Sequence, residues 1–371
     1  MSSSLKERSQ KILAQADIQI NGTRPWDIVV HDERFYRRVL FQGSLGLGES
    51  YMDGWWDVKH LDEFFTRVLR MRLDRQVSRT AKHLQKIASI LFNKQTLRRA
   101  FEVGERHYDI GNDLYRAMLD TRLTYTCGYW DKAENLEQAQ EHKLDLVCRK
   151  LGFKPGQKIL DIGCGWGSFA KFAAEKYGVS VIGVTVSKEQ AALARSLCTG
   201  LPVEILLEDY RNVQGMFDHI VSIGMFEAVG YKNFRTYMKI ARKHLKDGGL
   251  FLLHTIGGNE SVVDTDPWIH RYIFPNGMMP SIKQIGEAIE GLFVMEDWHN
   301  FGLNYDKTLM AWHHNFNTHW PELREKYGER FFRMWNYYLL ISAGSFRARD
   351  NQLWQIVLSK NGVEGGYQTV R

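Results

Sequence analysis

Glycines alternate with single residues at Gly163, Gly165 and Gly167, and an acid, Asp161, stands just ahead of them. Because glycine lacks a Cβ, the backbone there can adopt positive φ and approach a ligand closely. Residues 158–160 have the pattern of a short buried strand, and a helix with one apolar face is expected after Gly167. A strand that turns through such glycines into a helix presents backbone N–H groups, so this turn is the predicted cofactor loop. A glycine-rich turn without a ligand is the plainer alternative.

From residue 158 onward, expected strands alternate with expected helices. This alternation predicts an α/β fold with a mostly parallel sheet and helices on both faces. The glycine pattern before it resembles the loop of class I methyltransferases, and this resemblance implies the seven-stranded sheet of that fold. The expected strands are 158–160, 179–184, 203–207, 217–223, 250–254, 294–298 and 353–358, and the expected helices are 137–151, 168–176, 188–197 and 237–245.

Ligand chemistry in open α/β sheets takes place at the carboxyl ends of the strands. That rule gathers the glycine loop, Thr185, Glu208, Asp209, Glu227 and His254 at one rim. A nicotinamide dehydrogenase needs an acid after the second strand to hold the ribose. This chain has Thr185 there, with Gln190 as the nearest donor. Asp209 is placed to bind an adenine amino group, which favours S-adenosylmethionine (SAM) over NAD, and the glycine pattern itself resembles the loop of class I SAM methyltransferases.

The composition suits a protein of more than one domain that is active in the cytoplasm. The chain has 371 residues, 44% of them apolar and 25% charged. It contains no apolar run of 18 residues, so no transmembrane helix is expected, and its polar start is unlike a signal peptide. The four cysteines (Cys127, Cys148, Cys164 and Cys198) have neither metal-ligand spacing nor disulfide density, so no metal site is expected.

Positive charge is concentrated in residues 67–99. This segment holds ten basic residues and one acid, a net charge of +9, whereas the whole chain has +6. Leu84, Ile87 and Leu91 fall on one face of an expected helix there. A basic amphipathic helix is typical of binding to an anionic membrane or to nucleic acid. A solvated helix face packed on its neighbour explains the pattern equally well.

Three regions are expected: a small N-terminal α+β domain in residues 1–66, a basic helical connector in 67–100, and a catalytic domain in 101–371. In the first region, residues 18–20 and 28–30 are expected to be strands joined by a turn, and 35–40 to be helical. Four glycines and three large aromatic residues in 43–56 predict a tight turn under an aromatic cluster.

Cys127 lies among hydroxyl and aromatic side chains, directly after Tyr125 and Thr126. A reactive thiol needs a nearby base or helix N-terminus, and the sequence shows none beside it. Covalent catalysis by Cys127 is therefore not expected.

Further motifs extend over nearly the whole chain. They include Tyr125-Thr-Cys-Gly-Tyr-Trp130, Leu160-Asp-Ile-Gly-Cys-Gly-Trp-Gly167, Gly224-Met-Phe-Glu227, His254-Thr-Ile-Gly257, Tyr272-Ile-Phe-Pro-Asn-Gly277 and Phe346-Arg-Ala-Arg-Asp350, with residues 43–56 and 107–115. The combination resembles the cyclopropane-fatty-acyl-phospholipid synthase family. This resemblance implies an enzyme that adds a methylene from SAM across a cis double bond of an unsaturated acyl chain in a phospholipid.

The resemblance also implies a bicarbonate site and further cofactor contacts. The bicarbonate site falls on Cys127, Glu227, His254, the backbone of Ile256, and Tyr305, and the added cofactor contacts fall on Tyr125 and Thr126. One departure is Ala228, where many family members have histidine. Bicarbonate would stabilise the cationic centre formed on the acyl chain and remove the proton that closes the ring.

The partners implied are unsaturated phospholipids at an anionic membrane surface, with peripheral attachment to its cytoplasmic side, no nucleic acid, and a homodimer as the assembly considered. Three alternatives stay open. A related enzyme could give a branched methyl or methylene product. A small-molecule N-methyltransferase would not need the basic segment. A membrane-binding module without enzymatic activity would not bind SAM.

Overall fold

The computed structural model describes residues 2–76 and 111–371. The chain forms two compact units, the first made of Met1–Phe92, Asp264–Pro275 and Tyr305–Asn351, the second of Asn93–Val263, Asn276–Asn304 and Gln352–Arg371. This division differs from the expected boundaries at residues 66 and 100, because segments far along the chain pack on the N-terminal elements. The expected connector helix, with Leu84, Ile87 and Leu91, lies outside the described residues.

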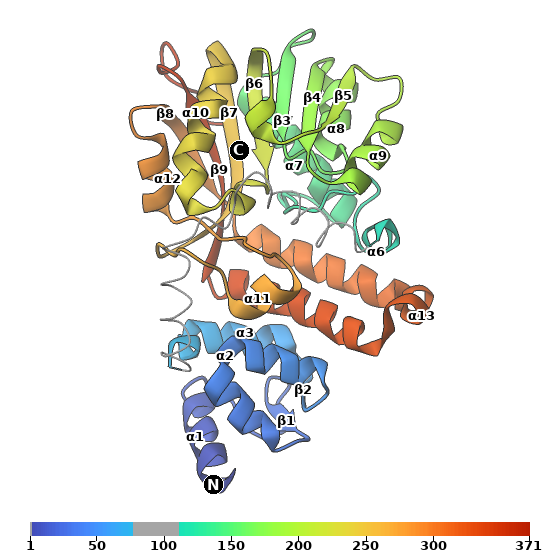
Figure 1. Ribbon diagram of the computed structural model, residues 1–371, viewed down its shortest axis with the longest axis vertical. Coiled ribbons are helices and arrows are strands. Elements are labelled where there is room, and N and C mark those ends of the chain that lie inside the picture. The colour runs from blue at the N-terminus through green and yellow to red at the C-terminus, as the bar shows by residue number, and fades with distance from the viewer. Residues whose placement is uncertain (1, 77–110) are drawn as a thin grey trace. The chain divides into compact units, whose positions relative to one another are not determined.

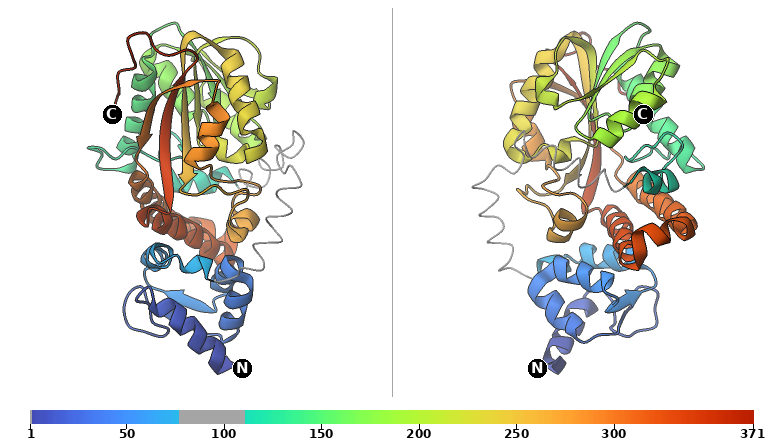
Figure 2. Two further views of the ribbon diagram at one scale, coloured as in Figure 1. Left: turned by 90° about the vertical axis from the view of Figure 1, so that its left-hand side faces the viewer. Right: turned by 45° about the vertical axis from the view of Figure 1, so that its right-hand side comes forward.

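The second unit is built on the seven-stranded sheet that the sequence predicted, in the order β5-β4-β3-β6-β7-β9-β8 (Figures 1 and 2). Its strands are β3 (Lys158–Ile162), β4 (Ser180–Thr185), β5 (Val203–Leu207), β6 (Phe217–Ile223), β7 (Leu245–Gly258), β8 (Val294–Asn300) and β9 (Asn351–Ser359). Neighbours from β5 to β7 pair in parallel, and β8 pairs antiparallel with β9. The sheet is therefore mostly parallel, and its carboxyl-end rim is the place expected for a ligand.

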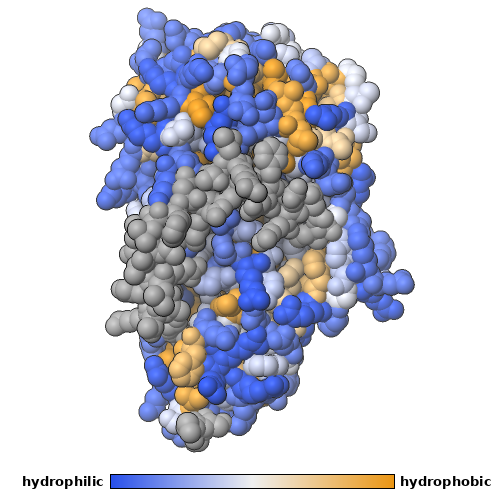
Figure 3. All heavy atoms as spheres, in the orientation of Figure 1, coloured by the Kyte–Doolittle hydropathy of each residue, from blue (hydrophilic) through white to orange (hydrophobic). Residues whose placement is uncertain are grey.

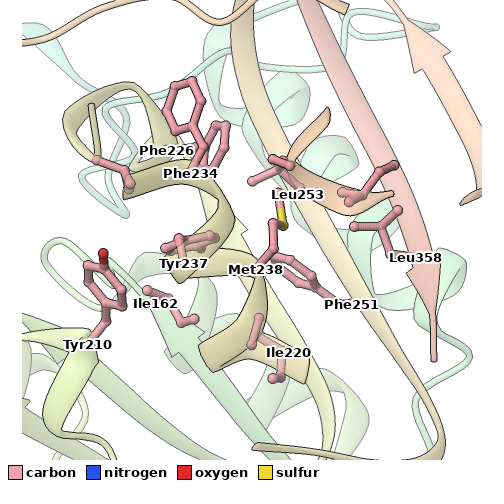
Figure 4. Packing of buried hydrophobic residues seen from close by; sticks show 14 of the residues in the cluster. Ile162, Tyr210, Ile220, Phe226, Phe234, Tyr237, Met238, Phe251, Leu253 and Leu358 are labelled. Atoms are coloured by element: carbon pink, nitrogen blue, oxygen red, sulfur yellow. The ribbon is translucent and has the colours of Figure 1, made fainter. Parts of the chain in front are cut away.

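Helices cover both faces of this sheet (Figure 2). The helices of the unit are α6 (Asn112–Met118), α7 (Leu136–Leu151), α8 (Ser168–Tyr177), α9 (Lys188–Leu197), α10 (Phe234–His244) and α12 (Ile282–Ile289). Helices α7 and α8 pack through Val147 and Phe169 against one face. Helices α10 and α12 pack on the other, where Tyr237, Met238 and Phe251 belong to one buried cluster (Figure 4). The two apolar layers hold the strand ends in fixed register.

The first unit consists of helices and a two-stranded ribbon. Its elements are α1 (Ser2–Ala14), β1 (Ile28–Val30), α2 (Arg34–Met52), β2 (Trp56–Val58), α3 (Leu61–Arg70), α11 (Pro267–Tyr272) and most of α13 (Leu303–Arg347). Strand β1 pairs antiparallel with β2. The expected strand at 18–20 is wrong: Ile20 makes a single parallel bridge to Ile28. The local hairpin does not form because β1 finds its partner beyond α2.

Residues 43–52 are helical, so the expected turn across 43–56 is wrong for most of its length. Gly43, with φ 59°, interrupts α2, and the helix then continues to Met52. A Cβ on Gly48 would lie 2.3 Å from the Trp268 ring, so this glycine lets α11 approach closely. The aromatic cluster was predicted correctly, since Trp56 lies 5.2 Å from Tyr51 and 5.5 Å from Phe64 between ring centroids.

Hydrophilic side chains predominate on the face of the molecule in Figure 3, with apolar side chains in smaller groups between them. Among the described residues, no helix combines the length and the apolar character needed to span a membrane. The same residues contain no group of three or more His, Cys, Asp or Glu side chains that could hold a metal ion.

Candidate active site

The predicted glycine loop connects β3 to α8 with all three glycines at positive φ: 84° at Gly163, 56° at Gly165 and 82° at Gly167. A Cβ on Gly163 would lie 2.6 Å from the Met225 side chain, whereas one on Gly165 would meet no atom within 4 Å. Close packing therefore requires the first glycine. At Gly165 the space over the backbone is open to within 4 Å, so the structure leaves room for the cofactor predicted at this turn.

Side chains at the ends of the next two strands lie at the same rim. The Thr185 hydroxyl donates to Gln190 Oε1 at 2.8 Å, and both side chains are buried. The Glu208 N–H donates to the Thr185 carbonyl at 2.9 Å. The Asp209 carboxylate is also buried and accepts from Arg211 Nε at 2.6 Å, a partner that the sequence did not indicate. A carboxylate has further acceptor positions, so Asp209 stays a prediction for the cofactor.

The segment that contains Tyr125, Thr126 and Cys127 lies against this rim. The Cβ position of Gly224, at the end of β6, is 2.7 Å from the Thr126 methyl group. The Tyr125 ring lies 5.2 Å from that of Tyr115. The buried Cys127 thiol donates to the Gly128 carbonyl at 3.1 Å. The structure therefore places Thr126 beside the end of β6, and the cofactor role of Tyr125 and Thr126 stays a prediction.

Glu227 lies in the 3₁₀ turn η4 (Phe226–Ala228), just beyond β6. Its Oε1 accepts from the Ile256 N–H at 2.6 Å. Burial raises the pKa of Glu227 to about 7, and the Ile256 N–H opposes part of that rise. The carboxyl group can thus gain and lose a proton near neutral pH. The sequence analysis assigned the Ile256 backbone to the bicarbonate site. In the structure its N–H donates to Glu227 and orients that side chain.

His254 lies on β7, where its residue is paired with Ile223 of β6. Gln355 Nε2 lies 3.3 Å from the His254 Nδ1 atom. Burial lowers the pKa of His254 well below its ordinary value, and the charge of Lys143 lowers it further. The imidazole is therefore neutral at physiological pH. When Gln355 donates to Nδ1, the ring proton is on Nε2, which becomes a hydrogen-bond donor.

Buried polar atoms without a protein partner occur together in this part of the second unit. They are Gln140 Oε1, Asp161 Oδ2, Glu227 Oε2, His254 Nε2 and Gln355 Oε1. Burial raises the pKa of Asp161 to about 7, and Lys143 opposes that rise. Buried polar groups normally have hydrogen-bond partners. Both donors and acceptors are present, so the residues fit a polar ligand with a charged or zwitterionic end.

Tyr305 belongs to the other compact unit. There its ring lies 4.6 Å from Phe346 and 5.9 Å from Trp312. The neighbouring Asp306 carboxylate accepts two hydrogen bonds from Arg347, both at 2.9 Å. The start of α13 is thus firmly held, and a shared role of Tyr305 with Glu227 and His254 stays a prediction.

The sequence analysis missed Lys143 and Gln140 on α7. Lys143 is fully buried and donates to Thr126 Oγ1 at 2.7 Å. Gln140 Nε2 donates to the Thr126 carbonyl, also at 2.7 Å. The signal was present: both fall at helical spacing with the apolar residues Leu136 and Val147. A lysine on the apolar face of a helix needs a buried partner.

A glycine loop after the first strand of a mostly parallel seven-stranded sheet, with acids at the following strand ends, defines a class I methyltransferase fold. Solved structures of similar proteins support this fold assignment. The chain matches the cyclopropane synthase MmaA2 from Mycobacterium tuberculosis with a TM-score of 0.66 and 32% identity, covering 70% of this chain and 98% of that one. It matches the mycolic acid cyclopropane synthase CmaA1, complexed with SAH and CTAB, with a TM-score of 0.66 and 31% identity over the same shares.

Sequence comparison identifies the family. The model of the mycolic acid cyclopropane synthetase family matches residues 95–356. The cyclopropane-fatty-acyl-phospholipid synthase of Escherichia coli (strain K12) is 54% identical over 98% of this chain and 95% of its own. The tuberculostearic acid methyltransferase UfaA1 of M. tuberculosis is 33% identical over 88% of this chain and 81% of its own. The chain belongs to the cyclopropane synthase family of SAM-dependent methyltransferases.

Proposed function

We propose that this protein transfers a methylene from SAM to the cis double bond of unsaturated acyl chains in membrane phospholipids and so forms a cyclopropane ring. The 54% identity to the E. coli synthase over nearly the whole chain supports this substrate. The observation that carries the chemistry is the pair of buried groups at the rim, Glu227 and His254, each with one polar atom that has no protein partner.

We infer that the glycine loop, Asp161, Thr185, Gln190, Glu208 and Asp209 hold SAM, with Tyr125 and Thr126 closing over it. When bound, SAM supplies a methyl group on a positively charged sulfur. An alkene is a weak nucleophile, so the chain must hold it in line with that methyl group and exclude water. The buried rim at Asp161 and His254 supplies such a dry surface.

We further propose that Glu227, His254, Ile256, Cys127 and Tyr305 form the bicarbonate site. When bound, bicarbonate supplies a base near the cationic carbon. His254 Nε2 would donate to an anion, because its other nitrogen faces Gln355. Glu227 Oε1 is held by the Ile256 N–H, which leaves Oε2 to share a proton with the anion. Ala228 cannot take part, so the donors come from the other residues.

The lipid substrate requires the enzyme to work at a membrane surface. We propose peripheral binding to anionic lipids on the cytoplasmic face through residues 67–99, with a net charge of +9. Each Lys or Arg near such a surface contributes roughly 1 kcal/mol, screened by salt. Co-sedimentation with anionic vesicles should therefore weaken as salt rises. Salt-independent binding would remove electrostatics as its basis.

A branched methyl or methylene product is the second candidate, and the 33% identity to a protein named as a tuberculostearic acid methyltransferase favours keeping it. Both reactions add one carbon to the chain, but ring formation leaves no double bond, whereas a methylene branch retains one.

The test is to incubate the purified protein with SAM, bicarbonate and vesicles of a monounsaturated phospholipid. Mass spectrometry should show a gain of one CH₂ per acyl chain, and NMR should show cyclopropane protons. Vesicles of the saturated phospholipid are the control and should stay unchanged. Omission of bicarbonate should abolish turnover without affecting SAM binding. A product that keeps an olefinic signal would support the methylene-branched alternative, and no product would overturn both the cyclopropane and the methylene-branched candidates.

A further inference from the structure

The fully buried Lys143 has no part in the chemistry above, yet it contacts a residue proposed to bind the cofactor. Its ammonium donates to Thr126 Oγ1 at 2.7 Å. A protonated amine has three donors and no acceptor. The hydroxyl oxygen must therefore accept from Lys143, and its own hydrogen must point away from α7. Lys143 thus restricts the direction in which the Thr126 hydroxyl can donate.

The rest of Thr126 is held as firmly as its hydroxyl. Its carbonyl accepts from Gln140 Nε2 at 2.7 Å, one turn earlier on α7. Its methyl group lies against Gly224, where a Cβ would be only 2.7 Å from that methyl group. The side chain of Thr126 is therefore held in place beside the end of β6, and its hydroxyl hydrogen is left to donate to a group other than Lys143.

Titratable groups surround Lys143: the carboxyl groups of Asp120 and Asp161 favour its ammonium form, and the Cys127 thiol and the His254 imidazole also lie within electrostatic reach. Burial lowers the pKa of Lys143 to about 8, and Asp120 opposes that shift. At neutral pH the residue is therefore mainly protonated. The hydroxyl of Thr126 is polarised by a full positive charge, which makes it a stronger donor toward an anion.

We propose that Lys143 is a positioning residue that orients the Thr126 hydroxyl as a donor to the carboxylate of the methionine end of SAM. This inference rests on the proposed cofactor site. It differs from a purely structural role in one measurable way. Removing the ammonium should weaken only ligands that carry the carboxylate, because the adenosine end binds elsewhere along the rim.

Calorimetry with two probes separates these roles: S-adenosylhomocysteine has the amino-acid end, and 5′-methylthioadenosine lacks it. We expect Lys143→Met to weaken binding of S-adenosylhomocysteine roughly tenfold to a hundredfold, the range for a hydrogen bond to a charged group. Binding of methylthioadenosine should stay within about twofold. The matched control is Lys150→Met, which removes another buried lysine of the same helix and should change neither affinity.

Thr126→Val keeps the lysine and removes only the hydroxyl, so it tests the same point if Lys143→Met does not fold. It should show the same selective loss. Equal weakening of both probes, or no weakening of either, would overturn the proposal. So would an unchanged S-adenosylhomocysteine affinity with a higher bicarbonate requirement, because the donor would then serve the other anion. If the wild type fails to bind S-adenosylhomocysteine, the proposed function itself is wrong.

Discussion

Two lysines on α7, Lys143 and Lys150, are both buried, and burial lowers the pKa of each to about 8. They lie two turns apart on one face of the helix. Around Lys150 the network is closed: its ammonium lies 3.1 Å from His299 Nδ1 and 3.6 Å from Asp297 Oδ2. Arg371 donates to both Asp297 oxygens, at 2.6 and 2.7 Å.

The network around Lys143 is open by comparison. Asp161 faces the ammonium with one buried oxygen that has no protein partner. Burial and a shifted pKa are thus common to both lysines and do not distinguish function from structure. What differs is whether the neighbouring polar atoms are satisfied by the chain itself. An unsatisfied buried group costs about 1–3 kcal/mol, so a fold that retains several in one place is expected to gain a ligand there.

The largest effect should follow from changing Glu227, whose Oε2 is among the unsatisfied atoms. Glu227→Gln removes a proton-sharing group without changing its size. We expect turnover to fall roughly 10²- to 10⁴-fold, as for positioned acid–base groups, with SAM binding retained. The control is Glu296→Gln, because the Glu296 carboxylate accepts from Ser359 Oγ and the Val363 N–H. If turnover falls equally in both variants, a carboxyl oxygen without a protein partner does not mark a functional group.

The same substitution should also change the pH dependence of stability. Burial raises the pKa of Glu227 from 4.5 to about 7. Between these values the folded protein keeps a proton that the unfolded chain has lost, so this group's contribution to stability falls as pH rises. Glu227→Gln should therefore be more stable than the wild type at pH 8, by up to about 3 kcal/mol, and similar at pH 4.5. Urea unfolding at both pH values measures the difference. A gap that does not change with pH would contradict the buried, titrating carboxyl group.

A substitution in the glycine loop should change the free energy of SAM binding by an amount similar to that stability change. At Gly165 a side chain meets no protein atom, so Gly165→Val should project into the proposed ligand space. We expect SAM affinity to fall roughly tenfold to a hundredfold, as for an overpacked contact of 1–3 kcal/mol. Gly200→Val is the control, because Gly200 also has positive φ and open space but lies after α9, in an exposed turn. Calorimetry should show a loss of SAM affinity in Gly165→Val and not in Gly200→Val. Equal losses would mean that backbone strain, not occlusion, lowers the affinity.

The sequence predicted the sheet well because period and composition carry that information locally. All seven strands and the loop at Gly163 were found from apolar runs that end at glycines or polar residues. The N-terminal ribbon was missed because the partner of β1 lies beyond α2, a pairing that local pattern does not encode. Residues 43–52 were misjudged because helix propensity counts glycine as a breaker, whereas here Gly48 provides the close approach of Trp268.

The site was only partly predictable, for a related reason. Glu227 and His254 could be placed from the strand order, since the ends of parallel strands meet at one rim. Lys143 could not be assigned a role, because a lysine on a helix is normally solvated and its partner Thr126 lies on a separate loop. Likewise, nothing in the sequence indicates that Asp209 meets Arg211. Such pairings depend on how elements pack, which becomes visible only in three dimensions.

The smallest effect is expected at Lys150, where it tests most directly the difference between the two buried lysines of α7. In Lys150→Met the Asp297 carboxylate keeps both hydrogen bonds from Arg371, so no buried charge loses its partner. The charge of Lys150 helps to lower the pKa of His254, but burial is the larger cause, so the imidazole should stay neutral without it. We therefore expect a stability loss of roughly 1 kcal/mol, typical of single substitutions, and turnover within about threefold of the wild type. Thermal unfolding and steady-state kinetics at pH 7.5 measure both. A loss of turnover as large as that of Glu227→Gln would show that the two lysines serve one network. The presence or absence of hydrogen-bond partners would then not distinguish the residues of the active site from those that only stabilise the fold.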